Sequence, residues 1–164
     1  MIAIPSDFNP EERRQRAMSL FREGYNCCQA VLLAFADILE PEVSAKVLAT
    51  IGSGLGGGMA RMREVCGSFS GAAMMAGFIS PADDPAVKDA RRVNYALVQS
   101  FAEEFKRRNG GSIVCRELLG LGSAAPKEGA TPSERTPDFY RKRPCEQIIG
   151  NAAAIVAEYI LKDK

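Results

Sequence analysis

The sequence predicts an all-α fold, a single-domain bundle of about six or seven helices. Apolar residues recur at the spacing of an α-helix in several segments. Helix-capping residues and glycines separate these segments, whereas the alternating pattern of β-strands is missing throughout. With 164 residues, the chain can bury the core of one domain but is short for two. We therefore expect one helical domain over residues 1–164, with residues 1–8 as an N-terminal extension.

The first two helices have clear start signals. Asn9 can cap a helix whose first residue is Pro10, and Gly24 ends this segment. Asn26 can cap a second helix, which we expect to run from about Cys27 to Leu39. Each helix has an apolar face that can pack in the core.

Small residues dominate the middle of the chain. Pro41 opens a predicted third helix that ends near Thr50, and a glycine-rich stretch occupies residues 52–58. We expect this stretch to form a flexible or tightly packed turn beside Cys66. The next helix begins at Cys66 and continues through Ala76. Its glycine, serine and alanine residues should let a neighbouring backbone come close.

The second half of the chain contains the longest predicted helix, which begins at Asp84–Pro85 and reaches about Arg108. A short helix is expected over Ser112–Leu119. Residues 121–144 are rich in Gly, Pro, Ser, Thr and charge, so we expect them to form a long surface loop or lid. The last helix is predicted to run from about Cys145 to Leu161.

The composition excludes several classes of function. The chain has no histidine, which excludes an imidazole base, a histidine metal ligand and a Ser-His-Asp triad. A net charge of +1, the lack of Trp and an aromatic content of 7% give no indication of nucleic-acid binding. No apolar run reaches the length of a membrane span, and the first residues do not resemble a signal peptide. We therefore expect a cytoplasmic protein that binds neither nucleic acid nor membrane.

Five cysteines in such a protein indicate metal binding, redox chemistry or simple burial, because a disulfide scaffold belongs to oxidising compartments. No CxxC pair occurs, so neither a zinc ribbon nor a thioredoxin-type site is indicated. Four cysteines lie at or near predicted helix starts, where the helix dipole and free N–H groups lower a thiol pKa. They are Cys27, Cys66, Cys115 and Cys145. If these helix starts meet, the thiols would form a Cys₄ centre or an exchangeable set.

Five short motifs spread along the chain resemble those of a known family. They are Asn26–Val31, Gly56–Met59, Glu64–Gly71, Cys115–Gly120 and Cys145–Ile149. Together they are similar to the C_GCAxxG_C_C family, small redox-active proteins named for four cysteines and a CGAxxG motif. The resemblance covers roughly residues 13–159 and implies that the four family cysteines correspond to Cys27, Cys66, Cys115 and Cys145. In this chain Ser68 replaces the motif alanine, and Cys28 stands beside the expected Cys27. A similar domain occurs in the split-Soret cytochromes, where an iron–sulfur centre is associated with it.

The first interpretation of the cysteines is thiol–disulfide or electron-transfer chemistry, as in a thiol-based oxidoreductase. Cys66 is then the predicted most reactive thiol, because Arg61 and Arg63 lie just upstream and a helix follows. Glu64 would oppose this effect if its carboxylate faced the sulfur. The resolving partner would be Cys27, Cys115 or Cys145, and a redox partner protein or small electron donor would supply the electrons.

Two other interpretations remain open. In one, Cys27, Cys66, Cys115 and Cys145 are metal ligands, with Cys28 as a substitute for one of them. A thiolate-only set suits an iron–sulfur cluster better than zinc, which usually draws on local CxxC pairs. In the other, the chain is a non-catalytic interaction module with structural thiols. Long apolar helices with small-residue faces also favour a homodimer, and the glycine-rich stretch could contact an anion through backbone N–H groups, although it lacks the ending of a P-loop.

Overall fold

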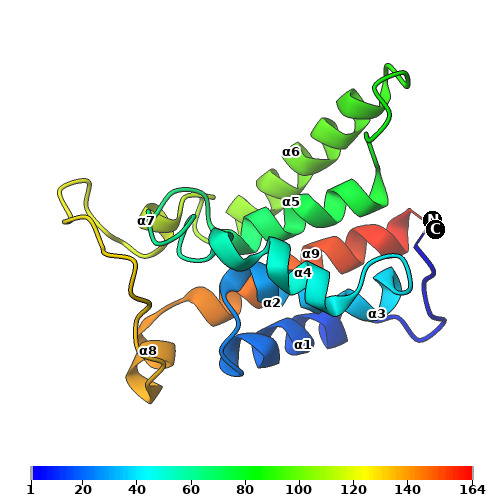
Figure 1. Cartoon of the computed structure of the whole chain (residues 1–164). Coiled ribbons are helices and arrows are strands. Elements are labelled where there is room, and N and C mark those ends of the chain that lie inside the picture. Colours follow the sequence, from blue (N-terminus) through cyan, green and yellow to red (C-terminus); the bar gives the residue numbers. More distant parts are fainter. Residues whose placement is uncertain (1, 164) are drawn as a thin grey trace.

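The computed structural model describes residues 2–163 and confirms the all-α prediction. These residues form nine α-helices and one short 3₁₀ helix, η1, and no named strand (Figure 1). The elements are α1 (Pro10–Arg22), α2 (Cys27–Leu33), α3 (Ala36–Leu39), α4 (Ala45–Ile51), η1 (Ser53–Leu55), α5 (Gly67–Ile79), α6 (Ala90–Arg108), α7 (Cys115–Leu118), α8 (Pro137–Lys142) and α9 (Cys145–Lys162).

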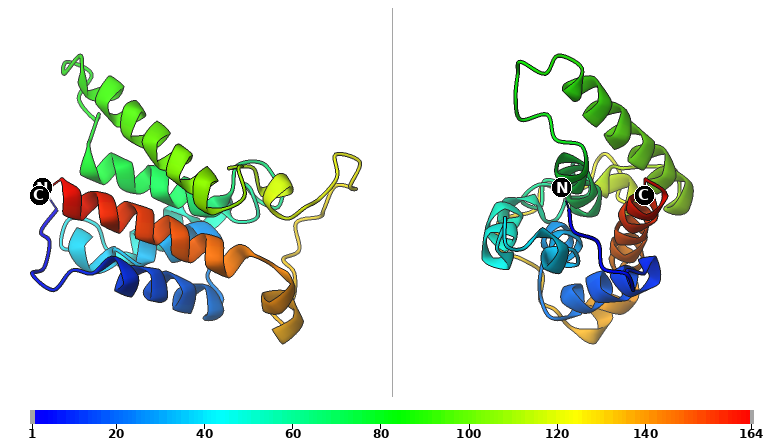
Figure 2. Two further views of the ribbon diagram at one scale, coloured as in Figure 1. Left: turned by 180° about the vertical axis from the view of Figure 1, so that it is seen from behind. Right: turned by 90° about the vertical axis from the view of Figure 1, so that its right-hand side faces the viewer.

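The last helix, α9, lies at the centre of the bundle. It packs against α1, α2, α5 and α6, and seen from behind it runs across the near face of the bundle, with α5 and α6 above it and α1 below (Figure 2, left). Its buried residues cover most of the helix between Ile148 and Ile160, whereas one polar stripe with Gln147, Asn151, Glu158 and Lys162 is at least partly exposed. The core therefore forms around α9, with Phe35, Phe105 and Met75 among the largest fully buried side chains.

Several helices begin at the same end of the bundle. The first residues of α2, α5 and α9 lie near α7 and the glycine-rich segment, at the left of Figure 1. The two chain termini lie together at the opposite end. This arrangement collects four helix N-termini, with their free backbone N–H groups, around one region of the molecule.

The close approach predicted for the small-residue helix is confirmed. Where α5 meets α2, a Cβ atom added at Gly71 would lie 2.9 Å from Cβ of Val31. One added at Gly67 would lie 2.6 Å from the carbonyl oxygen of Leu55. Both positions therefore require glycine for steric reasons.

Two helix boundaries in the first half differ from the prediction. The second predicted helix is interrupted at Phe35, whose φ of −114° and ψ of 8° leave the helical region, so it divides into α2 and α3. The prediction that Pro41 opens the third helix is wrong. The Glu40–Pro41 peptide bond is cis, and α4 begins four residues later, where the hydroxyl of Ser44 accepts from the N–H of Val47 at 3.3 Å. The prediction failed because Ser44, a capping residue that follows the proline, starts the helix instead.

Three boundaries in the second half also differ. The helix predicted from Asp84–Pro85 begins only at Ala90, because the Asp84 carboxylate accepts from the N–H of Ala86 and holds a turn. The short helix predicted over 112–119 is confined to α7. The predicted loop over 121–144 contains α8, which Thr136 caps by accepting from the N–H of Phe139. These interruptions raise the helix count above six or seven.

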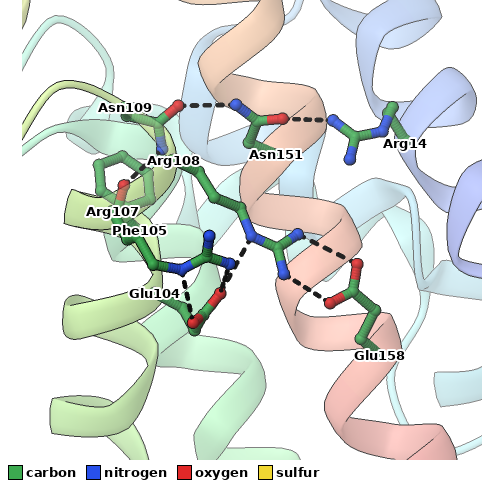
Figure 3. Close-up of polar contacts among 8 residues, drawn as sticks. All are labelled: Arg14, Glu104, Phe105, Arg107, Arg108, Asn109, Asn151 and Glu158. Atoms are coloured by element: carbon green, nitrogen blue, oxygen red, sulfur yellow. Dashed lines mark hydrogen bonds and ion pairs between the residues drawn. The ribbon is translucent and has the colours of Figure 1, made fainter.

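A polar seam holds α6 against the central helix and continues to α1 (Figure 3). Arg108 donates to both carboxylate oxygens of Glu158, at 3.0 and 2.6 Å, and also to Glu104. Beside it, Asn151 donates to Asn109 at 2.9 Å and accepts from Arg14. Three helices are thus joined by charge-assisted hydrogen bonds on the rim of the core.

The segment before α1 also contacts the core, although it was predicted as an extension. Phe8 is buried, and the guanidinium of Arg13 lies 4.7 Å from the centre of its ring. Within residues 2–163 no helix is long and apolar enough to cross a membrane. The predicted homodimer stays a prediction.

The buried Arg13 supports a test of stability. Its guanidinium donates to the carbonyl of Ala34 at 2.8 Å and to both carboxylate oxygens of Asp37, at 2.5 and 2.8 Å. Burial raises the pKa of Asp37, but hydrogen bonds and charge from Arg13 and Arg16 outweigh it and leave that pKa below its usual value. The ion pair therefore stabilises the fold above the ordinary carboxyl pKa, and the contribution is lost as pH falls through the lowered value.

We expect Asp37→Asn to lower the free energy of unfolding by about 1 kcal/mol at neutral pH, since Asp37 is partly exposed and its charge is screened. Urea unfolding at neutral and acidic pH measures the difference, which should shrink as the wild-type carboxyl becomes protonated. The control is Asp83→Asn, an exposed residue with no ion pair or hydrogen bond from its side chain in residues 2–163, and it should change little. An equal effect of both variants at every pH would contradict the ion-pair interpretation.

Candidate functional site

The four cysteines predicted to lie at helix starts line one cavity of about 340 Å³. Cys27, Cys115 and Cys145 are the first residues of α2, α7 and α9, and Cys66 is the N-cap of α5. Cys66 and Cys115 are buried, whereas Cys27 and Cys145 are partly exposed. The structure thus brings together all four predicted site residues, while their chemical roles stay a prediction.

Cys28 lies apart from this group. It is fully buried in the hydrophobic core and does not line the cavity. Burial raises its pKa to about 12, so its thiol is neutral at physiological pH. Its position agrees with a structural role and does not support its use as a substitute for Cys27.

A single β-bridge joins the segments that carry Cys66 and Cys115. Val65 pairs antiparallel with Val114. On either side of the bridge, the N–H of Cys66 donates to the carbonyl of Ile113 at 2.8 Å, and the N–H of Cys115 donates to the carbonyl of Glu64 at 2.7 Å. Two thiols from distant parts of the chain are therefore held by paired backbones.

The glycine-rich stretch is a tightly packed turn that forms part of the cavity wall. Residues 57–61 all have positive φ, between 48° and 67°, and include the non-glycine residues Met59, Ala60 and Arg61. Such residues cost about 1–2 kcal/mol each in the left-handed conformation. Backbone hydrogen bonds offset this cost, including Ala60 N–H to Gly54 at 2.9 Å and Glu64 N–H to Gly58 at 2.8 Å. The unusual backbone is therefore fixed by its own hydrogen bonds.

Asn26 connects this turn to the start of α2. Its side chain accepts from the N–H of Gln29, and Gln29 returns a bond to the N–H of Asn26, which completes a capping box. The same Asn26 amide donates to the carbonyls of Gly52 and Ser53 at 3.1 and 3.2 Å. The predicted cap thus also positions Cys27 against the glycine-rich turn.

Burial dominates the acidity of three cavity thiols. It raises the pKa of Cys66 to about 12, together with the neighbouring Cys27 and against opposing hydrogen bonds from Ser68 and Phe69. It raises the pKa of Cys145 to about 11 and also raises the pKa of Cys27. The expectation that helix starts lower these pKa values is therefore wrong for all three, because desolvation of a thiolate outweighs the helix N–H groups.

Cys27 is the thiol that interacts with each of the others. Its charge raises the pKa of Cys66 and of Cys145, and the charge of Cys115 raises the pKa of Cys27. Like charges act in this way only at short range in a protein interior. Cys27 is therefore coupled electrostatically to each of the other three thiols.

Cys115 differs from the other thiols because an arginine contacts it. Nη1 of Arg63 donates to the sulfur of Cys115 at 3.7 Å, and Arg63 is itself buried. A guanidinium that donates to a sulfur forms a charge-assisted hydrogen bond and stabilises negative charge that develops on that atom. The sequence placed Arg63 near Cys66, whereas the β-bridge directs it to Cys115.

Glu128 attaches the segment that follows α7 to Arg61 and Arg63. It forms ion pairs with Arg63 and with Arg61, whose Nη2 lies 3.0 Å from Oε1 of Glu128. Hydrogen bonding to Arg63 is the main cause that holds the pKa of Glu128 at about 2. Beyond it, Ala130, Pro132, Ser133 and Arg135 line the cavity, so this part of residues 121–144 covers the thiols.

Sequence reasoning missed the functional significance of Glu128, Arg135 and Arg143. Arg143 was visible as part of a basic run, but nothing local showed that it faces the cysteines. Glu128 bonds to Arg63, 65 positions away, and Arg135 bonds to the carbonyl of Phe21, 114 positions away, so their places at the site could not be read from local sequence.

The cysteines are close together but are not arranged as metal ligands. Among residues 2–163, no group of three or more His, Cys, Asp or Glu side chains has positions suited to holding a metal ion. The donor types still suit a soft metal, since the cavity offers four sulfurs and no histidine nitrogen. A metal centre would therefore require the thiols to move together.

The fold and the cavity define a helical protein with a thiol-lined site. The chain belongs to the C_GCAxxG_C_C family, whose family model, described as "Putative redox-active protein (C_GCAxxG_C_C)", matches residues 25–159. This match confirms the resemblance inferred from the five motifs and covers all four cavity cysteines. No curated protein and no solved structure shows significant similarity to the chain.

Proposed function

We propose that the protein performs thiol–disulfide chemistry in this cavity, with Cys115 as the attacking thiol and Cys27 as the resolving thiol. The observation that carries the proposal is the hydrogen bond from Arg63 to the sulfur of Cys115. The family's description as redox-active supports the same class of chemistry. The electrostatic coupling between Cys27 and Cys115 supports the role of Cys27 as partner.

The proposed reaction is an exchange with a disulfide acceptor. The Cys115 thiolate attacks one sulfur of the acceptor, which forms a mixed disulfide and releases the first thiolate. Cys27 loses its proton and attacks the Cys115 sulfur, which forms a Cys27–Cys115 disulfide and releases the second thiolate. The two protein thiols together lose two electrons and two protons, and the acceptor disulfide is reduced to two thiols.

Cys115 is a better candidate for the first attack than Cys66, the residue favoured by sequence. Burial keeps the pKa of Cys66 at about 12, so only a trace of its thiolate exists at neutral pH. In residues 2–163 no arginine donates to its sulfur, whereas Arg63 donates to Cys115. Arg63, upstream of Cys66, thus contacts a thiol on another segment.

The test compares two adjacent cysteines. We expect the reduced protein to form one reversible disulfide in a thiol–disulfide buffer, and Cys27→Ala to abolish it. Cys28→Ala is the matched control, because it removes a neighbouring thiol that does not reach the cavity, and it should retain the disulfide. Peptide mapping after alkylation identifies the pair. Equal and slow reactivity of all five cysteines, with no defined disulfide, would support purely structural thiols instead.

A second candidate, an iron–sulfur electron carrier or sensor, is favoured by the convergence of four thiols without any histidine. Cys27, Cys66, Cys115 and Cys145 would hold the cluster, which would supply one-electron transfer. Protein purified without oxygen distinguishes the candidates through its absorption spectrum and its content of iron, labile sulfide and zinc. A brown protein with stoichiometric iron and sulfide, lost when any of the four cysteines is replaced, would overturn the thiol–disulfide proposal.

A further inference from the structure

The charged residues that line the thiol cavity are all arginines. Arg61, Arg63, Arg135 and Arg143 contribute to its wall, and the wall contains no aspartate, glutamate or lysine. The whole chain has nearly equal numbers of cationic and anionic side chains, with a net charge of +1. Four like charges around one cavity are therefore a local concentration, which creates a positive potential inside it.

Two of these arginines have no carboxylate partner in residues 2–163. Arg61 and Arg63 share Glu128, which lies outside the cavity. Arg135 instead donates to the carbonyls of Phe21 and Tyr25, at 3.1 and 3.2 Å. These carbonyls, at the end of α1, leave the charge of Arg135 without a neutralising anion.

Arg143 is the less constrained of the two. Its guanidinium lies 4.8 Å from the ring centre of Phe139, and within residues 2–163 it donates no hydrogen bond. It lines the thiol cavity and also an adjoining cleft that holds Lys142 and Arg116. Arg143 therefore lies between the thiol cavity and a cleft of mixed charge that also contains Glu64 and Glu128, and its donors make no hydrogen bond within residues 2–163.

The remainder of the wall is shaped for an organic molecule. Phe21, Phe139 and Ile148 provide apolar surface, and Arg135 stacks on both aromatic rings, at 4.4 and 4.9 Å from their centres. The cavity volume of about 340 Å³ lies within the range of small-molecule sites. An inorganic anion alone would leave this apolar surface without a contact.

We propose that the cavity binds a small organic anion, with Arg143 and Arg135 contacting its negative groups and the four thiols beside its reactive part. The inference rests on the proposed thiol chemistry and names its substrate class, a disulfide that carries carboxylate groups. Guanidinium groups bind carboxylates through paired, charge-assisted hydrogen bonds, and Arg143 has its donors available for one.

The first experiment compares two aromatic disulfide reagents that differ in charge. Dithiobis(nitrobenzoate) carries two carboxylates, whereas dithiodipyridine carries none at neutral pH. We expect Arg143→Gln to slow the reaction of the anionic reagent with the cavity thiols by about tenfold, the effect of one charge-assisted hydrogen bond. Because the charge of Arg143 lowers the pKa of Cys145, the comparison is read at Cys115, whose sulfur is contacted by Arg63. The reaction of Cys115 with the neutral reagent should be unchanged, and added salt should slow only the anionic reaction.

Arg141→Gln is the matched control. It removes the same charge two residues away in the same basic run, but Arg141 pairs with Asp138 and does not line the cavity. Neither reagent should respond to this change. An equal response of both variants would show a general surface-charge effect and would overturn the proposal.

A second measurement separates binding from redox chemistry. Nitrobenzoate, which has no sulfur, should protect Cys115 from the neutral reagent iodoacetamide in the wild type and in Cys27→Ala, and about tenfold more weakly in Arg143→Gln. If nitrobenzoate protects Cys115 but neither the wild type nor Cys28→Ala forms a disulfide, the anion site stands and the thiol–disulfide function fails. If the disulfide forms but nitrobenzoate gives no protection, the anion site is wrong and the function stands.

Discussion

Replacing Gly67 with alanine is expected to lower the free energy of unfolding by about 2–3 kcal/mol, because it overpacks the contact between α5 and the chain that faces it. The new methyl group would lie 2.6 Å from the carbonyl oxygen of Leu55 and closer still to the sulfur of Cys27. The carbonyl belongs to the backbone of η1, so relief requires a shift of either that helix or α5. Chemical denaturation measures the loss.

Gly77 provides a control in the same helix. A methyl group added there would meet nothing within 4 Å, so Gly77→Ala should stabilise the protein by about 0.5–1 kcal/mol through helix propensity. The two glycine-to-alanine changes thus have opposite expected signs. A loss of similar size in both would show that α5 is sensitive to side-chain volume in general, and not at the thiol cavity in particular.

Gly67→Ala should also alter the site. The displaced sulfur belongs to Cys27, the proposed resolving thiol, so the yield of the expected disulfide should fall along with stability. Gly77→Ala should leave that yield unchanged, since Gly77 lies away from the cavity.

Loss of the Arg63 charge is the second change with a large expected effect. Arg63→Gln should slow the alkylation of Cys115 by iodoacetamide about tenfold at neutral pH, because it removes a charge-assisted hydrogen bond to the reacting sulfur. The affected bond is the donation from Nη1 of Arg63 to the Cys115 sulfur. Peptide-resolved mass spectrometry measures the rate for each cysteine separately.

Arg61→Gln distinguishes the effect of the charge beside Cys115 from the effect of loosening the segment that carries Glu128. Both arginines hold Glu128, so either variant weakens the attachment of that segment, but only Arg63 contacts Cys115. Slower alkylation in Arg63→Gln alone, with recovery in Arg63→Lys, is the expected pattern. The same slowing in both variants would assign the effect to the covering segment and remove the basis for Cys115 as the attacking thiol.

Local signals predicted those parts of the fold that local interactions determine. Asn9 and Asn26 cap the helices that the sequence assigned to them, because an N-cap depends on residues within one turn. Of the four helix starts that carry the cysteines, only the start of α2 has such a cap, because α5, α7 and α9 begin without a side-chain cap hydrogen bond. Pro41 was misread since its helix signal competes with that of Ser44, and only the folded chain shows which one prevails.

The electrostatics of the site depend on pairings that periodicity does not encode. The bridge between Val65 and Val114 involves one residue from each side, too short for a strand pattern. The left-handed conformation of Met59 and Ala60 contradicts their local preference and is imposed by hydrogen bonds. The contact between Arg63 and Cys115 depends on both features. Because neither feature is visible in the sequence pattern, the sequence favoured Cys66, the cysteine nearest to Arg63 along the chain.

The wide separation of Cys27 and Cys115 along the chain has a consequence for the oxidised protein. A bond between them would close a loop of about 90 residues, which restricts the unfolded chain enough to stabilise the fold by about 4–5 kcal/mol in the chain-entropy description. Through the thermodynamic cycle, the same free energy makes the disulfide harder to reduce in the folded state. The oxidised protein would thus resist unfolding more strongly than the reduced protein. A melting curve would therefore report the redox potential of the solution around the protein.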